Sequence, residues 1–355
     1  MVEIDLPRKS RIVKKYPRVL NALRLKIGQG HFDGMLPGVQ KLAQDFDVNF
    51  MTVNKAINML VRENLLYRIP RKGTFVRRTY RIALVFLHPK EARKGRMPDV
   101  YDNLIHGVEE ALNARNATMV FKNIDPGTGL PGLTRLVREV DGAILLGKIK
   151  NQRINEILDS FPAIRVMGMI DEKEKLDHVT YSNHSIGRLA AEYLIRRGCG
   201  KCAFICDSND NPLYLGRGEA FRETLEKAGE NVRMIIPEIP TDADMGMKAR
   251  VITSQLDRIL SKGPRPDGLF IPAAWMSGII YSFLFSRGVV PGKDVQIVIC
   301  DREIMQLSGL TPQPAYVDIH SDLVGKKAVE ILTRRIETPD KKREKILLEP
   351  SLVEN

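Results

Sequence analysis

The sequence predicts an α/β protein in which a small N-terminal winged helix-turn-helix is followed by two doubly wound parallel α/β lobes. Charge is the first observation, because residues 1–81 hold 17 Lys and Arg against 6 Asp and Glu, whereas the remaining residues are close to neutral. Inside the basic segment lie two short helical stretches and a basic hairpin. From residue 81 onward, strand and helix patterns alternate in two blocks. The asymmetry is typical of a basic module, most often one that binds nucleic acid, joined to an ordinary globular body.

The basic segment opens with an apolar stripe that predicts a helix starting near Tyr16, with Pro17 in its first turn. A short helix (36–46), a tight turn and a longer helix (51–64) follow. The longer helix has apolar residues at i, i+3, i+4 and i+7, namely Val53, Ala56, Ile57 and Leu60. Two short helices around a tight turn are typical of the helix-turn-helix.

Two short extended runs follow around Arg71, Lys72 and Gly73, and they predict a β-hairpin wing. The outward positions of the longer helix and the turn before it are small polar or basic residues, among them Asn49, Thr52, Asn54 and Lys55. Asn and Lys side chains can bond bases or phosphates, and Thr can touch a thymine methyl group. We therefore expect double-stranded DNA as the partner. A merely soluble amphipathic helix is the alternative.

The stretch LPGVQKLAQDFDVNFMTVNKAINMLVRENLLYRIPRKGTFV closely resembles the winged-helix domain of the GntR family of bacterial transcription regulators. The likeness covers about residues 11–78 and rests on LP, LA, TV, A and GTFV occurring together. It implies that Gln40 touches the DNA backbone. The residues it implies for the recognition helix and the wing tip are Asn49, Thr52, Asn54, Lys55, Lys72 and Gly73. Phe50 stands in place of the usual Arg, and the loss of that basic contact argues against the usual operator pattern. Asn64 also replaces the usual Gly.

Beyond the basic segment, short apolar runs alternate with amphipathic stretches. The predicted strands include RIALVFL (81–87), DGAILLG (141–147) and CAFICD (202–207), each followed by a helical pattern. Alternation in two blocks predicts two doubly wound lobes. In such folds ligands bind outside the carboxyl ends of the strands, so the cleft between the lobes is the expected site.

No pattern for catalysis, a cofactor or a metal stands out. The sequence has no G-x-S-x-G elbow, no Walker A motif and no G-x-G-x-x-G between a strand and a helix. Cys199, Cys202 and Cys206 are spaced like metal ligands, but the run around them is typical of a buried strand, where cysteine acts as a small hydrophobe. We therefore expect no enzyme, no cofactor and no metal site. Without a long apolar run or a signal-like N-terminus, we expect a cytoplasmic protein with no membrane contact.

The body resembles the effector domain of the LacI/GalR family, itself similar to periplasmic sugar-binding proteins. The likeness is spread over residues 81–350 and follows the order DGAILLG, VTYSNHSIGRLAAEYLIRRG, LGRGEAFRETLEKAG and VPGKDVQIVICD. It implies that Arg217 and Asp301 bind the effector. A guanidinium and a carboxylate suit the vicinal hydroxyls of a sugar. A salt bridge between the lobes is the alternative role for each residue.

Asn183 and Trp275 complete the expected effector site, and both stand beside departures from the family pattern. Ser182 replaces the Asp that precedes Asn183 in the family, and Ala273-Ala274 replaces an Asn-Asp pair before Trp275. Hydrogen-bonding groups are lost and the single tryptophan is gained. The ligand therefore differs from the usual hexoses, or binding has been lost. Trp275 either stacks on a sugar or belongs to the core.

Together these patterns predict a bacterial DNA-binding transcription regulator, a repressor in preference to an activator, whose operator affinity is modulated by a sugar or sugar derivative. We expect a domain boundary at residue 80, with one lobe formed by residues 81–181 plus 312–345 and the other by residues 182–311 plus 346–355. Both resemblances imply a homodimer. Two alternatives stay open: a cytoplasmic sugar-binding receptor whose basic arm contacts RNA or protein, and a sugar-modifying α/β enzyme.

Overall fold

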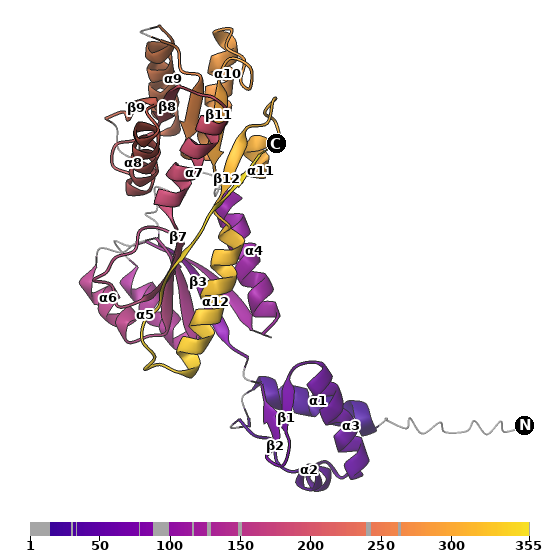
Figure 1. Cartoon of the computed structure of the whole chain (residues 1–355). Coiled ribbons are helices and arrows are strands. Elements are labelled where there is room, and N and C mark those ends of the chain that lie inside the picture. Colours follow the sequence, from indigo (N-terminus) through magenta and orange to yellow (C-terminus); the bar gives the residue numbers. More distant parts are fainter. Residues whose placement is uncertain are drawn as a thin grey trace, which may run out of the picture. The chain divides into compact units, whose positions relative to one another are not determined.

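The computed structural model describes residues 15–29, 31–32, 34–77, 79–87, 99–115, 117–125, 129–147, 151–238, 243–261 and 264–354 (Figure 1). Contacts within the chain divide it into two units, Met1–Tyr80 with Arg115–Thr118, and Arg81–Ala114 with Met119–Asn355. The first unit holds a two-stranded sheet and the second holds two six-stranded sheets, one in each of two lobes. The predicted fold class, a winged helix-turn-helix followed by two parallel α/β lobes, is confirmed.

The N-terminal unit is a winged helix. Its elements are α1 (Lys15–Gly28), α2 (Val39–Phe46), α3 (Phe50–Arg62), β1 (Leu66–Ile69) and β2 (Gly73–Val76). α1 begins where the sequence predicts, and Pro17 lies in its first turn, where a missing N–H is tolerated. The three helices each bury an apolar face in a common core, which includes Val19, Leu23, Leu42, Val53, Ile57 and Leu60. β1 and β2 pair antiparallel, so the predicted hairpin is present.

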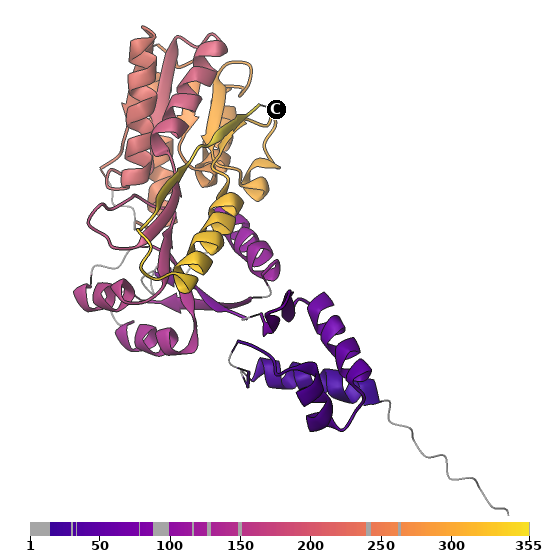
Figure 2. The same cartoon turned by 60° about the horizontal axis from the view of Figure 1, so that its bottom comes forward.

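The first lobe is built on a sheet with the strand order β13-β7-β6-β5-β3-β4. Its strands are β3 (Arg81–Leu87), β4 (Thr118–Ile124), β5 (Gly142–Leu146), β6 (Ala163–Val166), β7 (Asp177–Tyr181) and β13 (Lys345–Leu348). α4 (Asp99–Asn113) and α12 (Ser321–Glu337) pack side by side on one face, as both views show (Figure 1, Figure 2). α5 (Leu130–Glu139) and α6 (Gln152–Asp159) pack against the other face. With both faces covered, the central strand β5 is buried at every position.

The second lobe has the strand order β14-β12-β11-β10-β8-β9, and β14 runs antiparallel to β12. Its strands are β8 (Lys201–Ile205), β9 (Asn231–Ile235), β10 (Gly268–Ile271), β11 (Gln296–Cys300), β12 (Ala315–Asp318) and β14 (Ser351–Val353). α7 (Asn183–Arg196) packs against α8 (Pro212–Lys227), while α9 (Met245–Ser261) and α10 (Ser277–Ser286) share a core with the sheet. Two short segments, η2 (Ala274–Met276) and α11 (Ile304–Leu307), follow the carboxyl ends of β10 and β11.

The chain crosses between the lobes three times, after β7, after β12 and after β13. The predicted return to the first lobe at residue 312 is wrong, because β12 pairs in parallel with β11 and stays in the second lobe. The return comes with α12, which packs against α4. The predicted end of the first lobe at residue 345 is also too early, because β13 pairs with β7 as far as Leu348. Three crossings at one edge of the cleft form a hinge about which lobes can rotate.

Candidate DNA-binding surface and effector site

The predicted recognition helix, α3, begins with a polar cap. Asn49 is the N-cap, and its Oδ1 accepts a hydrogen bond from the N–H of Met51 at 2.8 Å. Thr52 and Asn54 are half-buried, and Oδ1 of Asn54 accepts a hydrogen bond from Nη2 of Arg68 on β1 at 3.3 Å. The predicted residues therefore share one helix end, but the side-chain oxygens of Asn49 and Asn54 already bond within the protein.

Lys55 and Gln40 are exposed. Nζ of Lys55 lies 5.0 Å from the ring centroid of Tyr16 on α1. An exposed cation near an aromatic ring gains only about 0.5–1 kcal/mol, so the Lys55 ammonium can leave the half-buried ring of Tyr16 for a phosphate. Gln40 is the second residue of α2 and projects from the first helix of the helix-turn-helix.

The wing presents its cations at a turn with special backbone geometry. Arg71, with a φ of 62°, and Gly73, with a φ of 131°, both have positive φ, and Lys72 lies between them. All three residues are exposed. Behind the turn, the rings of Tyr67 and Phe75 stack with their centroids 5.5 Å apart, which stiffens the hairpin. The sequence did not point to Arg68, because its partner on α3 lies 14 residues earlier in the chain.

Arg217, on α8, is the centre of the candidate effector site, and it is only 3% exposed. Its Nε donates to Oδ1 of Asn183 at 2.9 Å, its Nη1 to the carbonyl oxygen of Pro272, and its Nη2 to the hydroxyl oxygen of Tyr181 at 3.4 Å. The rings of Tyr181 and Tyr214 flank the guanidinium at 5.6 and 5.5 Å. Two of the predicted residues, Arg217 and Asn183, are thus in direct contact.

Asp301 follows β11 and is buried together with Glu303. Burial raises the pKa of the Tyr101 hydroxyl on α4, and these two carboxylates raise it further. Burial by itself lowers the pKa of Arg217, but Cys300, the flanking tyrosines and Asp301 raise that pKa above its ordinary value. Arg217 therefore stays a cation. The charge of Asp301 acts on Arg217, and it also acts on Tyr101, which belongs to the first lobe.

Trp275 lies in η2 and packs, partly buried, against the core of the second lobe. Nζ of Lys248 lies 5.8 Å from its ring and 2.8 Å from Oδ2 of Asp207, and both charged residues are buried. Asp207 follows β8 as Asp301 follows β11, so both carboxylates lie at the carboxyl edge of the same parallel sheet. A carboxylate after a buried strand was the available signal for Asp207, whereas nothing in the sequence marks Lys248.

A cavity of about 440 Å³ opens between the lobes. The first lobe lines it with Gly147, Arg165 and the segment 167–172, and the second lobe with residues 211–213 at the start of α8. Apolar side chains, among them Met167, Met169, Ile170 and Leu213, share the lining with charged ones, namely Arg165, Asp171, Glu172 and Glu174. The volume suits a small ligand. The lining residues described do not include the four predicted for the effector site, Asn183, Arg217, Trp275 and Asp301.

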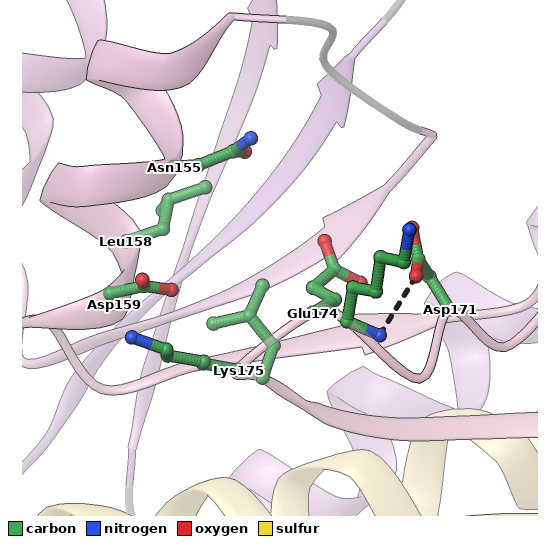
Figure 3. Close-up of a pocket in the computed structure, with 8 residues that line it drawn as sticks. Asn155, Leu158, Asp159, Asp171, Glu174 and Lys175 are labelled. Carbon is green, nitrogen blue, oxygen red and sulfur yellow. Dashed lines mark hydrogen bonds between the residues drawn. The ribbon is translucent and has the colours of Figure 1, made fainter.

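A smaller cavity of about 190 Å³ lies in the first lobe alone. Asn155 and Asp159 of α6 line one side of it, and Glu174 and Lys175 line the other (Figure 3). A ligand there would contact a single lobe, so it could not bridge the cleft.

The four cysteines are free thiols buried in the second lobe. Burial raises the pKa of Cys199 to about 11, and that of Cys202 and Cys206 to about 12. These thiols stay protonated near neutral pH, in agreement with their predicted role as small hydrophobes. Across the described ranges, no group of three His, Cys, Asp or Glu side chains is placed to hold a metal ion. No helix in those ranges has the length and hydropathy of a membrane span.

Two family models match this chain, residues 15–76 to bacterial regulatory proteins of the gntR family and residues 191–355 to the periplasmic binding protein-like domain. The ribose operon repressor of Escherichia coli (strain K12) is 26% identical over 264 residues, which cover 72% of this chain and 77% of that protein. The transcriptional repressor NagR of Bacillus subtilis (strain 168) is 38% identical over 63 residues, 17% of this chain and 26% of that protein. A solved structure, the transcriptional regulator CelR–cellobiose complex, has the same fold with a TM-score of 0.62, 20% identity, and coverage of 97% of this chain and 99% of that one.

The fold joins a winged helix-turn-helix domain to a two-lobed α/β domain. The chain is a transcription regulator that combines a gntR-family helix-turn-helix with a periplasmic-binding-protein-like domain similar to those of LacI-family regulators. The combination of families that the sequence predicts is confirmed.

Proposed function

We propose that this regulator is a cytoplasmic repressor that binds a two-fold DNA operator as a homodimer, and that a carbohydrate in the cleft changes its affinity for that operator. Residues up to 80 form the DNA-binding domain in this proposal, and the remainder forms the effector domain. One observation carries it: the guanidinium of Arg217 is buried and fixed where the two lobes meet, by Asn183 and by Tyr181 of the first lobe, and it keeps donors for a ligand.

The DNA side of the proposal rests on exposed polar and basic groups. Gln40, Lys55, Arg71 and Lys72 are exposed on the helix-turn-helix and the wing. Because these groups are already hydrated, they can meet phosphates without breaking buried contacts. Asn49 caps α3, so its proposed part in binding is to orient the helix rather than to contact a base through its oxygen.

The ligand side rests on the donors and acceptors at the cleft. Arg217 has five N–H donors, and three of them bond Asn183, Pro272 and Tyr181. Within the described part of the chain, the other two have no hydrogen-bond acceptor. They can donate to a sugar hydroxyl, while a carboxylate such as Asp301 accepts from its neighbour. The names of two relatives, a ribose operon repressor and a CelR–cellobiose complex, point to the same class of ligand.

A ligand in this cleft would contact both lobes and favour their closed arrangement by the difference in its affinity for the two states. In a homodimer, closure changes the spacing of the two winged helices, which must match half-sites about one helical turn apart. Operator affinity then depends on the ligand, and by linkage the operator changes ligand affinity by the same factor.

The experiment is a thermal-shift screen of monosaccharides and sugar phosphates, because a ligand at 100 times its dissociation constant adds about 2.7 kcal/mol to the stability of the fold. The dissociation constant of the best sugar is then measured through the fluorescence of Trp275, the single tryptophan. A lost charge-assisted hydrogen bond costs about 1.5–3 kcal/mol, so Arg217→Ala and Asp301→Ala should each bind about tenfold more weakly or worse. Both variants should bind DNA normally in the absence of sugar.

Arg222→Ala is the matched control. Arg222 lies on the same helix, but its ion pairs with Glu219 and Glu226 are at the surface and contribute little, so this variant should bind sugar like the parent. Parent-like affinity in the Arg217 and Asp301 variants would remove the pocket assignment. A screen without any binding sugar, in a protein that still binds an operator, would reject the carbohydrate and leave the DNA-binding part standing.

A further inference from the structure

Two large apolar side chains are exposed at the start of the recognition helix. Phe50 and Met51, the first two residues of α3, are 55% and 66% exposed. The core of the winged helix uses other positions of this helix, namely Val53, Ala56, Ile57 and Leu60. Phe50 and Met51 therefore forgo the stabilisation that burial would bring.

Polar and basic groups border this apolar pair. Residues four apart share one side of a helix, so Asn54 lies one turn beyond Phe50 and Lys55 one turn beyond Met51. Asn54 is bonded to Arg68 of the hairpin, and Lys55 is exposed. The cap by Asn49 fixes the backbone of this first turn. The helix end is thus a rigid apolar tip with cations beside it.

This combination matches the major groove of DNA. The phosphates attract the cations, and the 5-methyl group of thymine is the apolar contact that the base edges present. A protein partner fits less well, because a specific interface buries about 800 Å² on each side, far more than two side chains offer. On the proposed function, on which this inference rests, the N-terminal residues of the recognition helix face base edges. We propose that Phe50 and Met51 contact thymine methyl groups and thereby specify A·T pairs in the operator.

Replacing thymine with deoxyuridine removes the methyl group and leaves base pairing intact. A duplex is first selected from random-sequence DNA by the full-length parent and is then remade with deoxyuridine at each thymine in turn. The parent should lose about fourfold in affinity at one or more positions, since that factor corresponds to the burial of one methyl group. The Phe50→Ala, Met51→Ala double variant should bind the thymine and deoxyuridine duplexes equally, with the dependence on salt unchanged because no charge is lost.

Leu25→Ala is the control, because Leu25 is 62% exposed on α1 and its loss should leave the parent's discrimination intact. Equal affinity of the parent for every deoxyuridine duplex would overturn the inference. Discrimination that survives in the double variant would overturn it too. A parent that selects no duplex at all would contradict the proposed function itself, and the inference with it.

Discussion

The two units differ in how far the side chains of their ion pairs are exposed to solvent. The ion pairs of the N-terminal unit have side chains at least 32% exposed, and those described are Arg24–Glu63 and Lys41–Asp45. The C-terminal unit also has many surface pairs, but three of its pairs have side chains at most 15% exposed. These are Arg165–Glu174, Lys248–Asp207 and Arg335–Asp177. Arg217 and Asp301 add two more buried charges to that unit.

The difference is the one expected if the N-terminal unit binds DNA and the C-terminal unit binds a small ligand, as proposed. An exposed cation stays hydrated and meets a polyanion with an affinity that depends strongly on salt. A buried charge loses its hydration during folding, so it is oriented before a ligand arrives and is screened less by salt. We therefore expect charge substitutions in the N-terminal unit to alter binding alone. In the cleft of the C-terminal unit they should alter folding as well.

The largest effect is expected for Lys248→Met. This change leaves the carboxylate of Asp207 buried without its ammonium partner, which costs about 3–5 kcal/mol. The free energy of unfolding is measured in urea through the fluorescence of Trp275, whose ring lies next to Lys248 and reports on the second lobe.

Two variants sharpen this prediction. Adding Asp207→Leu to Lys248→Met removes both charges and should recover most of the lost stability, because an apolar pair replaces a buried ion pair at little cost. Arg287→Met breaks an exposed pair with Asp257 in the same lobe and should cost less than about 1 kcal/mol. If Lys248→Met unfolds at the parent's urea concentration, the buried pair contributes nothing and the contrast between the units fails.

A smaller effect, on binding alone, is expected for Lys55→Ala and Lys72→Ala. Each lost phosphate contact should lower the slope of log affinity against log salt by about 0.9 per protomer. Stability should change by less than about 1 kcal/mol, because both side chains are exposed and Lys55 gives up only its contact with the Tyr16 ring. Fluorescence anisotropy with a selected duplex, measured over a series of salt concentrations, gives the slope.

Lys227→Ala is the control for charge, because it removes one exposed lysine from the effector domain and should leave the slope unchanged. A Lys55, Lys72 double variant that binds the duplex like the parent at every salt concentration would show that these residues do not face DNA.

Local patterns were enough to predict most of the fold. The spacing of Val53, Ala56, Ile57 and Leu60 predicted one face of α3, and all four are buried. The crossings between the lobes could not be predicted in the same way. β12 has four residues, too few for a clear period, and its place beside β11 is decided by hydrogen bonds to a strand elsewhere in the chain.

The candidate sites could be predicted only in part, because a single sequence identifies residue types more readily than their partners. Arg217 came from its place in a motif, and the structure adds the contacts that hold it. The partnership of Lys248 with Asp207 spans 41 residues and leaves no local signal. Tyr101 comes from the other lobe, and the exposure of Phe50 depends on how α3 packs against the rest of the winged helix.

The smallest effect expected is a pH dependence of stability in the C-terminal unit. His178 on β7 is buried, and its Nε2 donates to the carbonyl oxygen of Met167 at 2.7 Å. Burial lowers the pKa of this imidazole, and the cations of Arg165 and Lys345 lower it further, against the opposing effects of Glu174 and the Met167 carbonyl. In the unfolded chain the pKa is about 6.5. Between that value and the lower folded pKa, the unfolded state binds more protons, so the free energy of unfolding should fall as pH falls through this window.

His178→Gln tests this prediction, since the amide can still donate to Met167 but cannot be protonated. The melting temperature of the variant should depend less on pH than that of the parent between about pH 7 and pH 5, the range in which an unfolded histidine titrates. His106→Gln on α4 is the control, because that side chain is exposed and its loss should leave the parent's pH dependence in place. If the His178 variant follows the parent over the whole range, the acid sensitivity comes from other groups and the prediction is wrong.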